Sequence, residues 1–203
     1  MSNALTDLVQ SIAPSAAVCR ALADDIRRAK AAGVDEQIER AITLCRRRCA
    51  ASGAAGGAIG NPFVAVPAAF VETGWVLRQH ALVAGTIGAL IEPDALLDEE
   101  SFRADVMSIV FPTAATQALG EVAQLAGRAC TRQLIRSTVK KDVLKAIVRF
   151  AAKYLGLKVT QRAILAKAVP LVGGVIGGTW NYVEAGGVGR RAARYFRGAD
   201  ISG

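Results

Sequence analysis

The stretch that decides the fold runs from Lys167 to Phe196 and reads KAVPLVGGVIGGTWNYVEAGGVGRRAARYF. It combines seven glycines with a high density of apolar residues, and it ends in arginines beside an aromatic pair. Glycines that recur four residues apart lie on one side of a helix, where the missing side chains leave a groove that a second helix can approach closely. Pro170 separates this helix, expected to begin near Leu171, from the preceding one. The stretch therefore predicts a helix that packs tightly against a neighbour.

A closely similar pentapeptide lies upstream. GGAIG at 56–60 nearly repeats GGVIG at 173–177, and both are flanked by apolar residues. Neither fits the glycine patterns that bind nucleotide phosphates, so the favoured role is helix packing, with packing at the depth of a lipid bilayer as the alternative. The predicted packing positions are Gly53, Gly56, Gly57, Gly60, Gly173, Gly174, Gly177, Gly178 and Asn181.

The remaining sequence also has a helical pattern. Apolar residues recur at three- and four-residue spacing, and no segment carries a convincing strand signal. The predicted helices cover about 15–32, 35–49, 67–91, 98–111, 113–135, 140–155, 160–167 and 171–196. We therefore expect an all-α fold, a compact bundle of eight or nine helices with glycine-rich, tightly packed central helices.

Several helix boundaries follow from individual residues. Gly33 is expected to end the first helix in a left-handed conformation, and Asp35 to cap the second. Pro67 suits the first turn of the long central helix, Pro93 ends it, and Asp98 caps the next one. The first two helices would form an antiparallel amphipathic pair over residues 1–48, in one continuous domain with a helical core over residues 49–203.

Composition and charge limit the classes of partner. Hydrophobic residues make up 52% of the chain but aromatic residues only 5%, which favours close helix packing. The net charge of +8 favours an anionic partner such as phospholipid headgroups, nucleic acid or an acidic protein. No secretory signal pattern opens the sequence, and four cysteines without a CxxC pair fit a reducing cytosol.

The uncharged segment 49–71 is long enough to cross a bilayer. Its glycines and prolines make it a poor continuous helix, and Ala and Gly contribute little transfer free energy. A buried glycine-rich turn that leads into a core helix is therefore favoured over a membrane span.

Candidate catalytic residues are scarce. Any histidine-dependent triad would require His80, which lies in a mostly apolar helix and is expected to be an interior or interfacial residue. Cys45 and Cys49, one helical turn apart with arginines between them, form either a reactive thiol pair or two small core residues. We therefore predict no catalytic residue, metal ligand or cofactor, and treat Glu72, Arg78 and His80 as a candidate polar cluster.

The C-terminal end of the last helix is the candidate surface for contact with anions. Basic residues beside aromatic rings suit a lipid headgroup layer, where cations meet phosphates and rings enter the acyl boundary. The residues concerned are Arg190, Arg191, Arg194, Tyr195, Phe196 and Arg197. The alternative is a solvated helix whose two rings dock on the core, and no nucleic-acid-binding motif accompanies the charge.

The C-terminal stretch closely resembles the C-terminal signature of the EcsC protein family. The residues that carry the resemblance are Lys167, Pro170, Gly173, Gly177, Asn181, Gly189, Ala192, Tyr195 and Phe196. A looser similarity covers about 49–196, with Glu72 where the family usually has aspartate and without the tyrosine-glycine pair usual near Ala89. The resemblance implies an all-helical bacterial protein, named from an operon that contains an ABC transporter, and it transfers no catalytic residue.

These features together predict a cytoplasmic, non-catalytic protein that associates peripherally with membranes or binds a lipid-like amphiphile between glycine-faced helices. The expected partner is an anionic membrane surface or lipid-like ligand, with no specific nucleic acid. The alternative is a protein-interaction module or regulator that acts on a transporter or another protein partner. An enzyme would need a polar pocket that the sequence does not indicate.

Overall fold

The computed structural model describes residues 11–29, 33–57, 62–93, 98–115 and 170–198. Throughout these ranges the regular secondary structure is helical, which confirms the predicted all-α class for this part of the chain. Its helices are α2 (Ala16–Ala29), α3 (Val34–Gly57), α4 (Pro62–Ile91), α5 (Glu99–Val110) and α9 (Pro170–Phe196). The helices predicted over 140–155 and 160–167, and most of the one over 113–135, lie outside the described residues, so the predicted number of helices stays a prediction.

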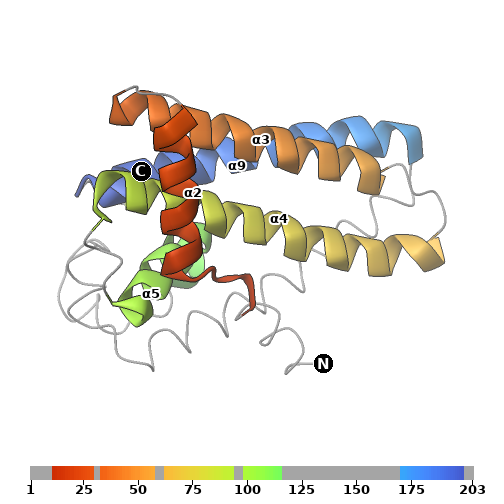
Figure 1. Cartoon of the computed structure of the whole chain (residues 1–203). Helices are drawn as coiled ribbons and strands as arrows, with labels where there is room; N and C mark the ends of the chain where they lie inside the picture. Colours follow the sequence, from red (N-terminus) through yellow and green to blue (C-terminus); the bar gives the residue numbers. More distant parts are fainter. Residues whose placement is uncertain (1–10, 30–32, 58–61, 94–97, 116–169, 199–203) are drawn as a thin grey trace.

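The long helices α3 and α9 lie side by side and antiparallel, with α4 running along the same pair (Figure 1). Arg197, just after α9, forms an ion pair with Asp35 in the first turn of α3. At the other end of the pair, Gly177 of α9 lies against Gly53 of α3. The antiparallel partner of α3 is therefore α9 and not α2.

The predicted pairing of the first two helices was wrong. Figure 1 shows α2 lying across α3 and α4, with its long axis nearly perpendicular to theirs. Helix packing follows the shapes of the contacting surfaces. Because α9 has small residues on its contact side, α3 can pack more closely against α9 than against α2. Amphipathic periodicity identifies the buried side of a helix, but it does not identify the helix that covers that side.

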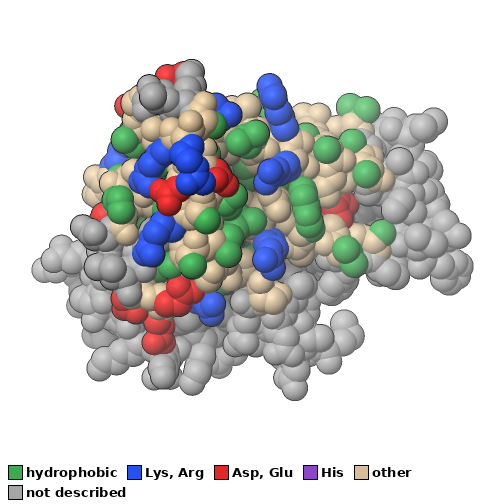
Figure 2. Space-filling model, viewed as in Figure 1, with side chains coloured by type: hydrophobic (Ala, Val, Ile, Leu, Met, Phe, Trp, Pro, Cys, Tyr) green, Lys and Arg blue, Asp and Glu red, His purple; other side chains and the backbone are tan. Residues whose placement is uncertain are grey.

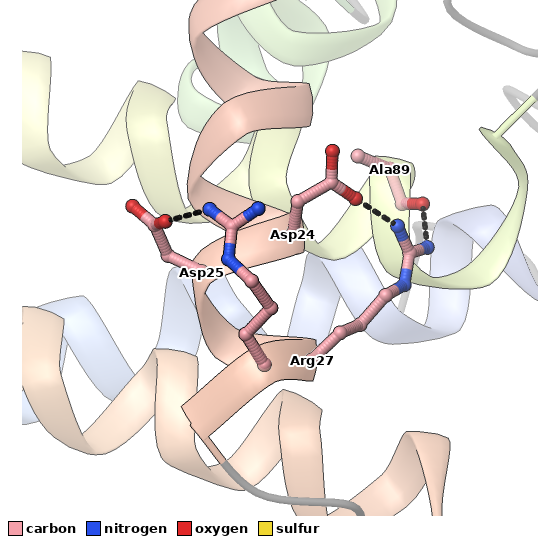
Figure 3. Close-up of polar contacts among 5 residues, drawn as sticks. Asp24, Asp25, Arg27 and Ala89 are labelled. Carbon is pink, nitrogen blue, oxygen red and sulfur yellow. Dashed lines mark hydrogen bonds and ion pairs between the residues drawn. The ribbon is translucent and has the colours of Figure 1, made fainter.

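Helix α2 is held at both ends by side chains from distant parts of the chain. At its start, the Ala16 amide donates to the Glu99 carboxylate of α5 at 3.0 Å. At its end, Arg27 donates to the Ala89 carbonyl of α4 at 2.7 Å and to Asp24 at 2.8 Å, as Figure 3 shows. Amides at the start of a helix and carbonyls near its end lack partners within the helix, so these contacts satisfy groups that would otherwise be unpaired.

The boundary between α2 and α3 differs from the prediction. Gly33 does not have a positive φ, and its carbonyl accepts the Gln37 amide at 3.1 Å, which places it at the N-cap of α3. Asp35 lies in the first turn instead of at the cap. Glycine is accepted at an N-cap, so Gly33 starts a helix where a left-handed helix end was expected. The left-handed end is found at Gly198, with a φ of 81°, two residues after the last residue of α9.

Other boundaries agree with the sequence. Asp98 caps α5 by accepting the Glu100 amide at 3.2 Å, as predicted. Helix α4 ends at Ile91, before Pro93, but it begins at Pro62 instead of Pro67. Pro62 is therefore the proline at the first helical position, where its missing amide hydrogen costs no hydrogen bond.

The uncharged segment 49–71 is mostly helical. Helix α3 continues through Gly53 to Gly57, well beyond the predicted end at Cys49, and α4 covers the segment from Pro62 onward. Residues 58–61, where the predicted turn would lie, are outside the described ranges. Among the helices that the structure describes, none combines the length and the apolar character needed to cross a bilayer.

Candidate functional site

The contact between α3 and α9 depends on two glycines. A Cβ atom placed on Gly53 would lie 2.5 Å from the Gly177 carbonyl oxygen, and a Cβ atom on Gly177 would lie 2.9 Å from the Gly53 carbonyl oxygen. A Cβ atom on Gly178 would lie 3.1 Å from the Ala50 carbonyl oxygen. The two backbones thus meet at a distance that leaves no room for a side chain.

The structure gives different amounts of information on the other predicted packing positions. Those that lie within the helices α3 and α9 are Gly56, Gly57, Gly173 and Gly174. Gly60 lies outside the described residues. Two further glycines of α9, which the pentapeptide comparison missed, also face α3: Gly186 lies against Arg46, and Gly189 lies against Ile42.

Asn181 joins three helices beside this contact. Its side chain is fully buried, and its amide nitrogen donates to the Cys49 carbonyl of α3 at 3.2 Å and to the Glu72 carboxylate of α4 at 3.1 Å. A buried amide is costly unless it is hydrogen-bonded, so these contacts fix the position of α9 against α3 and α4. Asn181 is therefore a structural residue at the junction of the three helices.

A buried thiol pair adjoins the same junction. The Sγ atoms of Cys45 and Cys49 are 3.8 Å apart, and Cys45 donates to the Gln79 carbonyl at 3.5 Å. The hydrogen bond with Cys45, followed by burial, raises the pKa of Cys49, and His80 offsets only part of this increase. Because the thiolate is the reactive form, Cys49 is a poor nucleophile, and the role of core residue is favoured over a reactive pair.

Arg78 lies apart from His80, with which it was predicted to form a polar cluster. His80 is 1% exposed and buried, whereas Arg78 is exposed on the outside of α4. Positions two residues apart are separated by roughly 200° around a helix, which explains why the two side chains point away from each other. The described residues provide no hydrogen-bond partner for either ring nitrogen of His80 and no group of His, Cys, Asp or Glu arranged to hold a metal ion.

The predicted anion-binding surface is partly wrong. Tyr195 is fully buried and donates to Asp105 at 2.5 Å, while the Phe196 ring lies over Gly88 of α4. These two rings dock on the core and are not available to a membrane. Arg191 is also partly buried, and burial lowers its pKa. The residues that remain exposed are Arg190, Arg194 and Arg197.

The exposed arginines continue an apolar surface that sequence reasoning missed. Trp180 is 62% exposed and Val183 is 60% exposed, and both precede the arginines on the same helix. We call this set the outer stripe of α9; it comprises Trp180, Val183, Gly187, Arg190, Arg194 and Arg197. Its members recur at three- and four-residue spacing and therefore share one side of the helix. The spacing was visible in the sequence, but only the structure shows that the tryptophan, the valine and the three arginines are exposed.

Basic and hydrophobic side chains also alternate on the surface above α3 and α4, as Figure 2 shows. The exposed residues of these helices include Arg40, Leu44, Arg47, Arg48, Val71, Trp75 and Arg78. The positive charge of the protein is therefore not confined to α9.

A groove lies between the N-terminal half of α3 and the C-terminal end of α9. It is open to solvent and has a volume of about 600 Å³. Its lining consists of Asp35, Ile38, Glu39, Ile42, Arg190, Ala193, Arg194 and Arg197. Three arginines face two carboxylates, so the lining has a net positive charge, and Arg197 forms an ion pair with Asp35 at one end.

Comparison of the chain with protein-family models, with curated protein sequences and with solved structures found no match. The functional proposals below therefore depend on the residues and their geometry.

Proposed function

We propose that this protein associates peripherally with anionic membrane surfaces through the outer stripe of α9. The observation that supports this function is the order of residues along the stripe, with exposed Trp180 and Val183 followed by exposed Arg190 and Arg194. An indole ring is suited to the boundary between headgroups and acyl chains, and guanidinium groups bind lipid phosphates. The stripe thus offers both components of interfacial binding on one helix.

The expected strength of this association is moderate. Each basic side chain near an anionic membrane contributes about 1 kcal/mol, and the contribution decreases with increasing salt. The few arginines of the stripe, together with two apolar side chains, would therefore support reversible binding. The function needs no reactive group, which suits the non-catalytic role expected from the sequence.

Vesicle flotation tests the proposal. Wild-type protein should float with vesicles that contain phosphatidylglycerol and remain unbound with vesicles of phosphatidylcholine alone. A variant with Arg190→Glu and Arg194→Glu should lose most of this binding. The matched control carries Arg20→Glu and Arg78→Glu, which reverse two exposed charges on other helices. Equal flotation of the two variants would refute a specific role for the outer stripe.

The alternative function is that of a protein-interaction module that acts on a transporter or another partner. Exposed tryptophan beside arginine favours it, because these residue types dominate the binding energy of protein interfaces. If the purified protein fails to bind any anionic vesicle but retains a stoichiometric protein partner that the Arg190→Glu and Arg194→Glu variant loses, the alternative replaces membrane binding.

A further inference from the structure

We propose that the groove between α3 and α9 binds the phosphate headgroup of a single anionic phospholipid, and that Asp35 competes with this phosphate for Arg197. The inference rests on the proposed function for the source of the ligand. It adds a defined site, a class of ligand and an internal competitor to the general attraction of a basic helix for a membrane.

The cations of the groove are arranged for an oxyanion. Arg190 and Arg194 lie one turn apart on α9, Arg197 follows directly after the helix, and all three line the groove. Guanidinium groups form paired, charge-assisted hydrogen bonds with phosphate oxygens, which carboxamides or single ammonium groups do not reproduce. A phosphate monoester, with up to two negative charges, is the anion best matched to these arginines.

The floor of the groove is suited to an amphiphile. Ile38 and Ile42 lie at its base but are only 3% and 1% exposed, so Ala193 provides most of the accessible apolar side-chain surface there. The glycerol backbone of a phospholipid can pack on Ala193 and on the aliphatic stems of the arginines, whereas a free phosphate ion can contact only polar groups. The volume of about 600 Å³ is within the range of small-molecule sites, so it can accommodate a headgroup.

Asp35 is the competitor in this site. Its carboxylate pairs with Arg197 across the end of the groove, and the two side chains are 84% and 50% exposed, respectively. Exposed ion pairs are weak, so a phosphate can displace the carboxylate at little cost. The position of Asp35 in the first turn of α3 keeps its negative charge close to Arg197 when the site is empty. Removing that charge should strengthen phosphate binding.

Isothermal titration calorimetry with dihexanoyl phosphatidic acid, held below its micelle concentration, tests the inference without a membrane. Asp35→Asn should bind it about two- to fivefold more tightly than wild type, and Arg194→Gln should bind it more weakly by a similar factor. The matched control, Arg20→Gln on α2, should bind like wild type. A gain of affinity in Asp35→Asn cannot result from misfolding.

The other ligands distinguish the source of the phosphate. Dihexanoyl phosphatidylcholine should bind weakly because its headgroup has no net charge. Inorganic phosphate should bind weakly because it has no glycerol backbone to pack on Ala193 and the arginine stems. Inorganic phosphate that binds as tightly as the phospholipid would overturn the assignment to a lipid. Unchanged or reduced affinity in Asp35→Asn would overturn the competition, and equal affinity in wild type and Arg194→Gln would overturn the site.

Lipid binding in the groove and membrane binding by the outer stripe can be tested separately. A variant with Trp180→Ala and Val183→Ser leaves every residue of the groove in place, so it should lose vesicle flotation but keep binding to the short-chain lipid. If the wild-type protein binds the short-chain lipid but does not float with vesicles, the proposed membrane association is wrong and the proposed lipid site in the groove still holds. If the wild-type protein floats with vesicles but does not bind the short-chain lipid, membrane binding by the outer stripe still holds and the proposed lipid site in the groove is wrong.

Discussion

The side-chain amide of Asn181 occupies the space that a Cβ atom on Gly53 would need, because the two would be 2.6 Å apart. The missing side chain at Gly53 thus allows Asn181 to reach the Cys49 carbonyl, one turn earlier in α3. Close backbone contact and the buried hydrogen bond are two consequences of the same glycine.

Gly53→Ala should destabilise the fold by about 1–3 kcal/mol, because the added methyl group meets the backbone of α9 as well as Asn181. Chemical denaturation followed by circular dichroism measures the change. Gly187→Ala is the matched control, since its new Cβ atom would have only the Arg191 side chain nearby, at 3.6 Å. That substitution should stabilise the helix by up to about 1 kcal/mol. Equal effects of the two substitutions would contradict the close contact.

Asn181→Asp should be more destabilising than Asn181→Ala at neutral pH. The alanine variant loses the hydrogen bonds to Cys49 and Glu72. The aspartate variant loses the same donor and in addition places a buried negative charge beside Glu72. Burial and Glu72 would raise the pKa of the new carboxyl group in the folded state, so its penalty disappears as the pH falls and the group becomes protonated. Unfolding free energies measured at several pH values should therefore converge at low pH; a constant difference would argue against a charge effect.

The thiols of Cys19 and Cys49 should react slowly in the folded protein. Burial raises the pKa of Cys19 to about 12, and the pKa of Cys49 is also raised. Above pH 9 the unfolded thiols lose their protons while the folded ones keep them, so the stability that these groups contribute below pH 9 is lost as the pH rises. Iodoacetamide labelling followed by peptide mass spectrometry should modify both residues in urea but neither in buffer at pH 8. Fast modification of the native protein would contradict this.

Tyr195→Phe should lower the free energy of unfolding by about 1–3 kcal/mol, because it removes the hydroxyl group that donates to buried Asp105. Tyr182→Phe is the matched control, since Tyr182 is 40% exposed and its ring contact with Arg46 does not require the hydroxyl group. Thermal unfolding should show a clear decrease for the first variant and little change for the second. If both variants unfold like wild type, the hydroxyl group of Tyr195 does not stabilise the core.

Trp180 should report membrane contact directly. The chain has two tryptophans, so a Trp75→Phe variant leaves Trp180 as its single indole. Its fluorescence should shift to the blue when vesicles containing phosphatidylglycerol are added, because the ring moves from water into the headgroup boundary. The reciprocal Trp180→Phe variant retains Trp75 and should show a smaller shift. A larger blue shift in the Trp180→Phe variant would indicate that the membrane contacts the surface of α3 and α4 instead.

The local features of the fold could be predicted from the sequence. Apolar spacing and a capping residue are encoded within one or two turns of helix, which is why α5 and its cap Asp98 agree with the prediction. The start of α9 at Pro170 was predictable for the same reason. Gly33 was assigned to the wrong helix because glycine is compatible with both a helix end and a helix start, and residue type alone does not distinguish them.

The spatial relationships could not be predicted in the same way. The contact of Gly53 with Gly177 joins segments far apart in the chain, and two similar pentapeptides do not specify which helices meet. The direction of each side chain around α9 was the second obstacle. Tyr195 and Phe196 point inward while neighbouring Arg194 and Arg197 point outward, so the predicted basic and aromatic surface is divided between the core and the solvent.

The attachment of α2 at both ends has a consequence for the C-terminal end of α9, which lies near α2 in Figure 1. Arg27 donates a hydrogen bond to the Ala89 carbonyl in the last turn of α4. The Phe196 ring packs against the neighbouring residue, Gly88. Removing the first 29 residues would remove the hydrogen bonds to Ala89 and to Glu99. The turn against which Phe196 packs would then be held less rigidly. Helix α2 thus supports the turn on which Phe196 packs, and a protein without α2 should hold its C-terminal end less firmly.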